Sequence, residues 1–399
     1  MKFALAQLNP VIGDLDGNAE KIFKVCQNIK SPDVDLVITP ELSLIGYPPK
    51  DLLFNPRLFE DESEILNKLT KRLNNLDQNL SVLIGIAEPT PDIEIPKLYN
   101  SVVILEKGTW RIIARKQLLP TYDVFDEKRY FRSAENSSIL NLTLQKKIWK
   151  IGITICEDIW VDQCLQNKKI LGKDPIKSLE KEKLDLLINL SASPFIESKN
   201  LLRHRIAAKA AIRLSCPVIY VNQVGGNDEL IFDGSSFTLD QKGNLQNELP
   251  AFKESVVICD LDIHKKQPAK SIQKPTSQEI LFRALVLGVK DYAKKCNFNS
   301  AIIGLSGGID SALVATIAVA ALGISKVHAI LMPSPWSSLG SVKDATSLAN
   351  RLGIDHQKIP ISGLMNSFND ALSNSTLGIP TGITAENLQS RIRGTILMA

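Results

Sequence analysis

Short, nearly continuous apolar runs alternate with longer segments of helical spacing along residues 1–262. Runs rich in Val, Ile and Leu predict strands covered on both faces, because a half-exposed strand would alternate apolar and polar residues. The predicted strands are 3–8, 35–39, 81–87, 101–106, 110–115, 150–155, 184–189, 218–222 and 256–261, and the predicted helices are 17–29, 60–75 and 201–214.

The pattern stops at a polar stretch and then starts again. Residues 262–277 read DIHKKQPAKSIQKPTS, with two prolines and no periodicity, which indicates a linker. The next elements alternate as in a parallel α/β sheet, where ligands bind at the carboxyl ends of strands. They are helix 278–295, strand 301–305, helix 310–322, strand 327–332, helix 342–352 and strand 357–359. We therefore expect two α/β domains, 1–262 and 278–399, joined by a linker at 263–277.

Composition and charge narrow the class of protein. The chain has 399 residues, of which 44% are hydrophobic and 23% charged, as in globular proteins with more than one core. The net charge of +4 is small and its lysines and arginines are scattered, which argues against a nucleic-acid partner. The amino terminus turns polar too early for a signal peptide, and the apolar run 312–322 is too short to cross a membrane. We expect a cytoplasmic protein with no membrane partner.

Cysteine and histidine usage limits the possible chemistry. The six cysteines form no CxxC pair, so neither a zinc knuckle nor a disulfide framework is indicated. The chain has only four histidines, which leaves few imidazoles for a Cys-His or Ser-His-Asp site.

Three reactive side chains follow predicted strands. Glu41 follows DLVITP, Lys116 follows WRIIAR and Cys156 follows KIGITI. Strand ends that point the same way converge on one pocket, although each residue alone also has an ordinary structural explanation. Two acids, Glu157 and Asp158, come directly after the cysteine, where negative charge disfavours a thiolate. If the strand ends at Ile155 and the chain turns there, adjacent side chains diverge and the two acids need not face the sulfur.

Four longer stretches resemble the nitrilase superfamily of carbon–nitrogen hydrolases in sequence and order: ITPELSLIGYPP, RKQLLPTYDVFDEKRYF, GITICEDIW and LINLSASPF. The resemblance covers nearly all of residues 1–262 and implies an α-β-β-α sandwich. It also implies that Glu41 is the general base of amide hydrolysis, that Lys116 stabilises the oxyanion and that Cys156 is the nucleophile. Lys116 can also favour the thiolate through its opposite charge.

The same resemblance assigns further residues. Glu127 matches a second carboxylate that positions the lysine. Tyr122, Ser193 and Lys199 match positions that bind L-glutamine in the glutamine-using members of the superfamily. A solvated loop or helix charge remains an alternative interpretation of Glu127 and Lys199.

The stretch AIIGLSGGIDSAL predicts a strand, a Ser-Gly-Gly turn and a helix, whose amide groups form an anion-binding nest. It lacks the lysine of a Walker A loop. It resembles the PP-loop of AMP-forming ATP pyrophosphatases, which have a Rossmann-like parallel α/β fold. The resemblance implies that Asp310 also holds Mg²⁺. The residues implied to bind ATP are Gly304, Leu305, Ser306, Gly307, Gly308, Ile309, Asp310 and Ser311.

Two more stretches, LMPSPWSSLGSVKDATSLANRLGI and ENLQSRIRG, resemble the NAD⁺ synthetases within this class. Asn387 and Arg391 match positions that contact deamido-NAD⁺, with an exposed face of an ordinary helix as the alternative. Pro335 and Trp336 depart from the usual pattern, which leaves the contacts on the adenine side open.

A nitrilase-type glutaminase fused to a PP-loop domain is the arrangement of the glutamine-dependent NAD⁺ synthetases. The resemblance implies a homo-oligomeric ligase that converts deamido-NAD⁺, ATP and L-glutamine, with Mg²⁺, into NAD⁺, AMP, diphosphate and glutamate.

The resemblance runs to the last residues, ILMA, whereas the family continues with a strand and a TGNKSE-like loop. We therefore expect a truncated second domain, in a polypeptide that hydrolyses glutamine but makes little NAD⁺. Two alternatives stay open. One is a plain nitrilase-type amidase with a vestigial nucleotide-binding region, and the other is a non-catalytic nucleotide-binding or assembly module.

Overall fold

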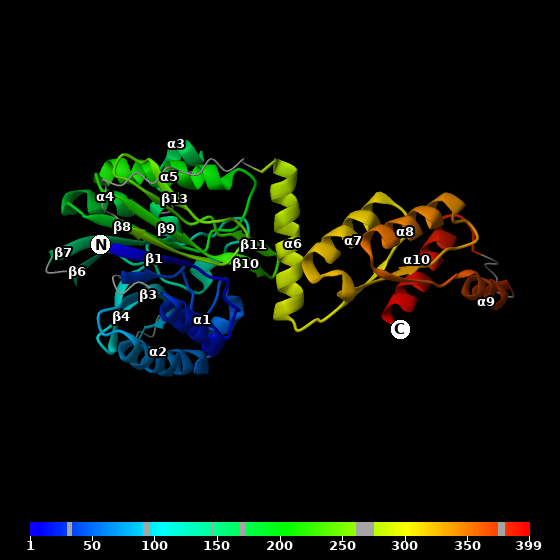
Figure 1. Ribbon diagram of the computed structural model, residues 1–399, viewed down its shortest axis with the longest axis horizontal. Coiled ribbons are helices and arrows are strands. Elements are labelled where there is room, and N and C mark those ends of the chain that lie inside the picture. Colours follow the sequence, from blue (N-terminus) through cyan, green and yellow to red (C-terminus); the bar gives the residue numbers. More distant parts are fainter. Residues whose placement is uncertain are drawn as a thin grey trace. The chain divides into compact units, whose positions relative to one another are not determined.

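The computed structural model describes residues 1–29, 34–90, 96, 98–144, 147–167, 172–260, 275–373 and 380–399. The chain divides into two compact units, Met1–Ala284 and Leu285–Ala399 (Figure 1). Most of the predicted linker, residues 263–274, lies outside the described residues.

The first unit contains two six-stranded sheets, in the orders β14-β1-β2-β3-β4-β5 and β13-β12-β9-β8-β7-β6. The strands of the first sheet are β1 (Lys2–Gln7), β2 (Val34–Ile38), β3 (Ser81–Pro89), β4 (Leu98–Glu106), β5 (Thr109–Arg115) and β14 (Ser255–Asp260). Those of the second sheet are β6 (Ser138–Leu144), β7 (Lys147–Ile155), β8 (Leu186–Ser191), β9 (Val218–Asn222), β12 (Phe237–Leu239) and β13 (Leu245–Glu248). A separate hairpin joins β10 (Val224–Asn227) to β11 (Leu230–Asp233).

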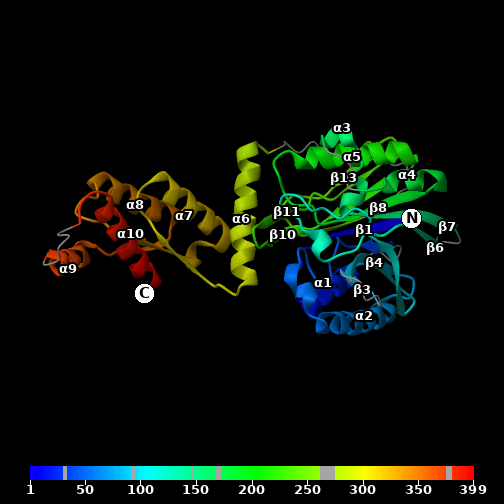
Figure 2. The ribbon, with the colours of Figure 1, turned by 180° about the vertical axis from the view of Figure 1, so that it is seen from behind.

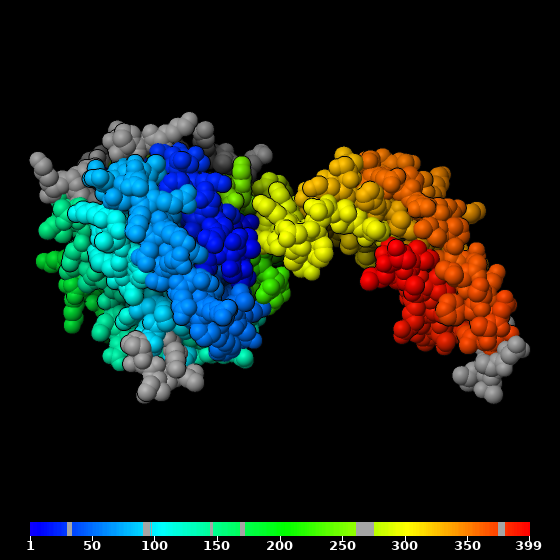
Figure 3. Space-filling model, turned by 90° about the horizontal axis from the view of Figure 1, so that it is seen from below, coloured from blue at the N-terminus to red at the C-terminus, as the bar shows by residue number. Residues whose placement is uncertain are grey.

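Helices cover the outer face of each sheet, so the unit has four layers (Figures 1 and 2). Helices α1 (Leu15–Asn28) and α2 (Arg57–Leu76) pack on the first sheet and form one face of the unit (Figure 3). Helices α4 (Pro175–Leu179) and α5 (Lys199–Leu214) pack on the second. A third apolar cluster fills the space between the sheets. The predicted α-β-β-α sandwich is confirmed.

The buried strands agree with the hydrophobic runs, but the prediction missed β6 and the short antiparallel strands β10 to β13. These segments lie at a sheet edge or in hairpins and carry polar or glycine residues, as in VGGN and LQNE. Such strands lack the continuous apolar signal of a central strand, and the sequence pattern therefore underestimates them.

The second unit has a parallel sheet in the order β15-β16-β17, formed by Ala301–Gly304, Val327–Leu331 and Asp355–Lys358. Helices α7 (Ile309–Leu322) and α8 (Leu339–Leu352) share one apolar cluster with it. Helices α9 (Ser362–Ser373) and α10 (Ile383–Met398) form another cluster, which Ile330 of β16 joins. Helix α6 (Ser277–Lys295) precedes this sheet in the chain. The sheet is thus covered on both faces, as expected for a Rossmann-like α/β fold.

Gly85 in β3 lets the loop after β2 lie directly on the first sheet. A Cβ atom at Gly85 would stand 2.2 Å from the amide nitrogen of Leu42 and 2.8 Å from the carbonyl carbon of Glu41. The amide of Leu44 also donates to the Gly85 carbonyl at 3.2 Å. The absence of a side chain at Gly85 therefore determines where the backbone of Glu41 runs.

We predict that Gly85→Ala lowers the free energy of unfolding of the first unit by about 1–3 kcal/mol, because the added methyl meets backbone that cannot rotate away. Urea denaturation followed by tryptophan fluorescence measures the change. Gly363→Ala in α9 is the control, since a Cβ atom there meets nothing within 4 Å. Equal stability of Gly85→Ala and the parent chain would contradict the close approach.

Candidate active site

A buried lysine is shared by two carboxylates at the centre of the first unit. Lys116 Nζ lies 2.7 Å from Glu41 Oε1 and 2.8 Å from Glu127 Oε1. All three side chains are buried, with Lys116 at 0% exposure. The structure thus brings together three residues that the sequence assigned to one site, although they come from the β2 loop, the end of β5 and the 3₁₀ turn Glu127–Arg129.

Neighbouring groups fix the two carboxylates. Glu41 Oε1 also accepts from Asn100 Nδ2 at 2.7 Å, and its Oε2 accepts from the amide of Ala192 at 2.9 Å. The hydroxyl of Tyr47 donates to Glu127 Oε1 at 2.8 Å. Burial raises the pKa of Glu127 to about 7, although Lys116 opposes this. Burial alone would lower the pKa of Lys116, but Glu127 and Glu41 hold it well above its ordinary value, so the ammonium stays charged.

Cys156 stands where β7 ends and a 3₁₀ turn, Cys156–Ile159, begins. Its φ angle of 44° lies in the left-handed region, which costs about 1–3 kcal/mol for a residue with a side chain and is most common at functional sites. The thiol is buried. Its pKa is raised, first by burial and then by the Glu41 carboxylate, while Lys116 lowers it. Lys116 therefore favours the thiolate as expected, but burial and Glu41 together raise the pKa of the thiol above its ordinary value.

The two acids that follow the cysteine have different roles. Asp158 accepts from the amides of Gln117 and Leu118 through Oδ1, at 3.0 and 2.8 Å, and from the amide of Ile155 through Oδ2, at 3.1 Å. Burial raises its pKa to about 7 against these hydrogen bonds. Glu157 accepts from the hydroxyl of Tyr122 at 3.0 Å, and its charge acts on the Cys156 sulfur. The charge of Glu157 therefore raises the pKa of the thiol, but less than burial and Glu41 do.

Two of the predicted glutamine-binding residues, Tyr122 and Lys199, lie close to this acid and the thiol. Tyr122 holds the Glu157 carboxylate, and the Lys199 ammonium lies 5.7 Å from the centre of the Trp160 ring. Burial and then the charge of Arg203 lower the pKa of Lys199 to about 8, while Cys156 and Glu157 raise it. A cation, an anion and a thiol thus lie close enough to influence one another.

Ser193 is held by a buried ion pair that sequence reasoning missed. Arg203 Nε donates to Ser193 Oγ at 3.2 Å and its Nη2 donates to the Ser193 carbonyl at 2.9 Å. Its Nη1 lies 2.8 Å from both carboxylate oxygens of Asp233. Arg203 lies in α5, where the sequence shows only an arginine in an amphipathic helix, and its 1% exposure depends on the tertiary fold. The local sequence pattern around Arg203 therefore did not indicate that this arginine is buried.

Several buried oxygens near these residues have no hydrogen-bond partner among the described parts of the chain. They are Asn100 Oδ1, Glu127 Oε2, Asn189 Oδ1 and Gln223 Oε1. Asn100 and Glu127 directly contact the Glu41–Lys116 pair. A buried acceptor without a donor is costly, so this site suits a ligand that carries N–H groups.

The second predicted site lies at the end of β15. Gly307 has a φ angle of 86°, and a Cβ atom there would stand 2.2 Å from the Ser341 carbonyl oxygen. Ser306 Oγ accepts from the amide of Gly308 at 3.2 Å and lies 3.0 Å from Ser311 Oγ. Helix α7 begins directly afterwards, so the turn presents amide groups and the positive end of a helix.

Of the remaining predicted residues of this unit, Ile309, Asp310, Asn387 and Arg391 are exposed, whereas Leu305 is buried and Gly304 half-buried. Asp310 lies in the first turn of α7. Within the described ranges, no group of three His, Cys, Asp or Glu side chains could hold a metal ion. A single carboxylate fits Mg²⁺ when phosphates and water supply the other ligands. Asn387 and Arg391 lie one turn apart on α10, which packs against β15, but among the residues that the structure describes no hydrogen bond joins them to the Ser306 turn.

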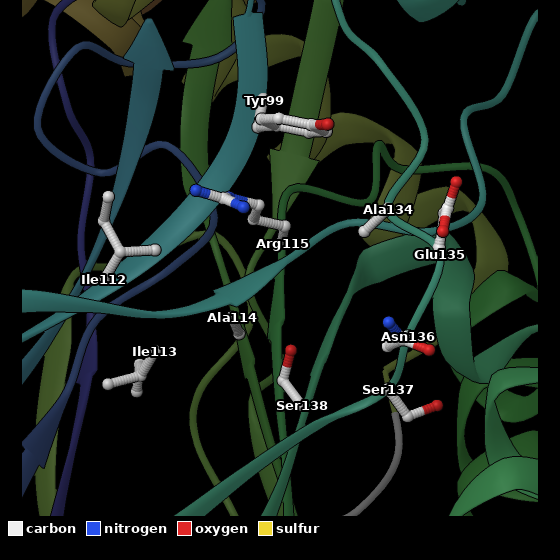
Figure 4. A pocket seen from close by; sticks show the side chains of 10 residues that line it. All are labelled: Tyr99, Ile112, Ile113, Ala114, Arg115, Ala134, Glu135, Asn136, Ser137 and Ser138. Atoms are coloured by element: carbon white, nitrogen blue, oxygen red, sulfur yellow. The ribbon is translucent and has the colours of Figure 1, made fainter. Parts of the chain in front are cut away.

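A separate cavity of about 540 Å³ lies beside β5 (Figure 4). Arg115 and Tyr99 face it from the sheet, and Glu135 and Asn136 line its other side. Successive residues of a strand point to opposite faces, so Arg115 reaches this cavity while Lys116 reaches the buried carboxylates. None of the predicted site residues lines it.

None of the helices in the described part of the chain is long and apolar enough to cross a membrane.

Two family models match the chain. The carbon–nitrogen hydrolase model matches residues 2–271, and the NAD synthase model matches residues 281–399. The chain is 45% identical to the glutamine-dependent NAD(+) synthetase of Synechocystis sp., over 99% of this chain and 71% of that protein. It is 36% identical to the enzyme of the same name from Acinetobacter baylyi, over 100% of this chain and 70% of the relative.

Solved structures agree with these matches. The glutamine-dependent NAD+ synthetase from Acinetobacter baumannii, in complex with adenosine diphosphate, has a TM-score of 0.88 at 36% identity. The alignment covers 100% of this chain and 72% of that one. An amidase from Nesterenkonia sp. has a TM-score of 0.52 at 17% identity over 65% of this chain and 90% of its own, which shows the shared fold alone.

We predict that alkylation of Cys156 by iodoacetamide accelerates steadily from neutral pH to about pH 9 without a plateau, because a raised pKa leaves little thiolate near neutrality. Glu41→Gln should move the curve to lower pH, since it removes a nearby negative charge. Peptide mass spectrometry separates Cys156 from the buried Cys26, and Cys156→Ala supplies the background. A plateau below about pH 8 in the parent chain would contradict the raised pKa.

Proposed function

Because the chain belongs to the glutamine-dependent NAD(+) synthetases, ligases that form a C–N bond with glutamine as amido donor, we propose that it amidates deamido-NAD⁺ at the expense of ATP. One observation carries the proposal: the buried Glu41–Lys116–Glu127 cluster acts on the Cys156 thiol, in a chain that also has a PP-loop turn. We assign residues 1–262 to the glutaminase domain and residues 278–399 to the ATP pyrophosphatase domain, joined by the linker 263–277.

In the glutaminase reaction, the Cys156 sulfur attacks the carbonyl carbon of the glutamine side-chain amide. Glu41 takes the thiol proton as the bond forms, which suits a cysteine whose pKa is raised in the resting site. Lys116 donates to the oxyanion, together with the amide of Glu157. When the intermediate collapses, the C–N bond breaks and Glu41 returns the proton to the leaving amine. The products of this half are ammonia and a thioester.

Hydrolysis of the thioester completes the cycle. Glu41 now accepts a proton from water, whose oxygen attacks the thioester carbonyl, and the sulfur leaves and is reprotonated. The product is glutamate. Glu127 keeps Lys116 charged and in place throughout, because it shares the ammonium with Glu41.

The charges around the thiol suit the amino-acid end of glutamine. The Glu157 carboxylate, held by Tyr122, matches the α-ammonium group, and the Lys199 ammonium matches the α-carboxylate. Ser193, fixed by Arg203, adds a hydroxyl and an ordered turn. The unpaired oxygens of Asn100 and Glu127 offer acceptors for the N–H groups of the amide or of ammonia.

At the second site, the Ser306–Ser311 turn and the start of α7 hold the pyrophosphate of ATP, through Gly304, Leu305, Ser306, Gly307, Gly308, Ile309, Asp310 and Ser311. The carboxylate of deamido-NAD⁺ attacks the α-phosphorus, and diphosphate leaves. Ammonia then displaces AMP from the mixed anhydride to give the amide of NAD⁺. Asp310 would help to hold Mg²⁺, which neutralises phosphate charge. Asn387 and Arg391 are assigned to deamido-NAD⁺.

Amide-¹⁵N glutamine, supplied with ATP, Mg²⁺ and deamido-NAD⁺, tests the proposal. We expect label in NAD⁺, measured by mass spectrometry. Cys156→Ala should lose this transfer by about 10³-fold or more while unlabelled ammonium chloride still supports NAD⁺ formation, because only the nucleophile has been removed.

The other outcomes decide between the alternatives. Label in ammonia alone would contradict the proposed amidation and leave only the glutaminase reaction. Ammonia release that ignores ATP and deamido-NAD⁺ and extends to other amides would favour a plain amidase. No label in either product, with no effect of Cys156→Ala, would refute an enzyme of this kind.

A further inference from the structure

Asp158 is buried, with 1% exposure, and it uses both carboxylate oxygens on main-chain amides. Its Oδ1 accepts from Gln117 and Leu118, the two residues after Lys116, at 3.0 and 2.8 Å. Its Oδ2 accepts from Ile155, the residue before Cys156, at 3.1 Å. One side chain thus holds the backbone on the carboxyl side of the lysine and on the amino side of the cysteine.

These two segments belong to different sheets. Lys116 follows β5, the edge strand of the first sheet, and Cys156 follows β7 of the second sheet. Strands of stacked sheets are not joined by a hydrogen-bonded ladder, and apolar packing between sheets sets their spacing only loosely. A carboxylate that spans the two segments fixes this spacing with directional bonds.

Other contacts make this link stiff. The amide of Lys116 donates to the Asn100 carbonyl at 2.8 Å, and its carbonyl accepts from the amide of Ala134 at 2.9 Å. The side chain of Leu118 packs in the same apolar cluster as Ile159, the residue after Asp158. In such surroundings a carboxylate without hydrogen-bond donors would be costly. The three hydrogen bonds from main-chain amides to Asp158 are therefore not easily exchanged for hydrogen bonds to water.

We infer that Asp158 is a positioning residue of the glutaminase reaction, which holds the Lys116 ammonium and the Cys156 sulfur at the separation that the oxyanion requires. The inference rests on the proposed function. Asp158 touches neither substrate nor the reacting atoms in this account and acts only through the backbone of Lys116 and Cys156. Because reaction rates are sensitive to displacements of about 1 Å, loss of the link should lower kcat more than it raises KM.

Asp158→Asn is the principal test, because asparagine keeps the shape but presents an N–H₂ group to one of the three amides. We expect kcat for glutamine hydrolysis to fall by about 10²-fold while KM changes by less than about threefold. Asp185→Asn is the matched control. Asp185 also accepts a main-chain amide of β7, that of Lys150 at 2.9 Å, but at the end of the strand remote from Cys156.

Stability is measured in parallel, so that misfolding does not imitate a catalytic defect. Activity is expressed per mole of folded protein from the amplitude of the unfolding transition, and Asp158→Ser serves as a second variant if asparagine aggregates. A second readout is the pH curve of Cys156 alkylation. It reports on Lys116, Glu41 and Glu157, whose charges act on the sulfur. It should move to higher pH in Asp158→Asn and stay unchanged in Asp185→Asn.

The outcomes separate this inference from the proposed function. If the parent chain releases no ammonia from glutamine, the proposed function fails. If the parent chain is active and Asp158→Asn keeps kcat within about threefold, the positioning inference is overturned. It is also overturned if Asp185→Asn loses as much kcat as Asp158→Asn at equal loss of stability, because the effect would then be a general consequence of weakening β7.

Discussion

The charge of Lys116 is shared between two carboxylates, and the first unit is organised around that sharing. The ammonium is fully buried, 2.7 Å from Glu41 and 2.8 Å from Glu127. Removing Lys116 would leave the two buried carboxylates without their cation, and breaking a buried ion pair in this way costs about 3–5 kcal/mol. Each surrounding contact, from the tyrosine hydroxyl on Glu127 to the Ala192 amide on Glu41, keeps this balance. Burial raises the pKa of the neighbouring Cys156 thiol, and the two charges of this pair then act on it in opposite directions, Glu41 raising the pKa and Lys116 lowering it.

Much of this arrangement could be predicted from the order of strands and the residues at their ends. The continuous apolar runs identified the central strands, and Glu41 and Lys116, which follow two of them, indeed meet in one buried cluster; Glu127, the third member, was assigned through the family resemblance. A buried strand must be apolar, and the chain must turn where the strand ends. The sequence pattern therefore identifies both the central strands and the residues at their ends. The resemblance to known families added the identities of the ligands, which periodicity does not contain.

Long-range geometry could not be predicted in the same way. The Arg203–Asp233 pair joins residues 30 positions apart, and the reach of Asp158 to Gln117 and Leu118 spans some 40. An arginine in an amphipathic helix or an aspartate after a cysteine has the same local pattern whether it is exposed or buried. The positive φ of Cys156 could not be predicted either, because the sequence around Cys156 has no pattern that is specific for a left-handed backbone. These features depend on which segments the completed fold places side by side.

The close approach of Gly307 to another segment of the chain matters for any attempt to transfer this turn to another protein. The backbone of Gly307 lies against the carbonyl of Ser341 in α8, with no room for even one methyl group between them. The shape of the Ser306–Ser311 turn is therefore determined by two segments more than 30 residues apart. Grafting only the residues SGGIDS onto another strand–helix junction would transfer the amide groups without the start of α8, against which the turn packs. The smallest portable unit is the turn together with the start of α8.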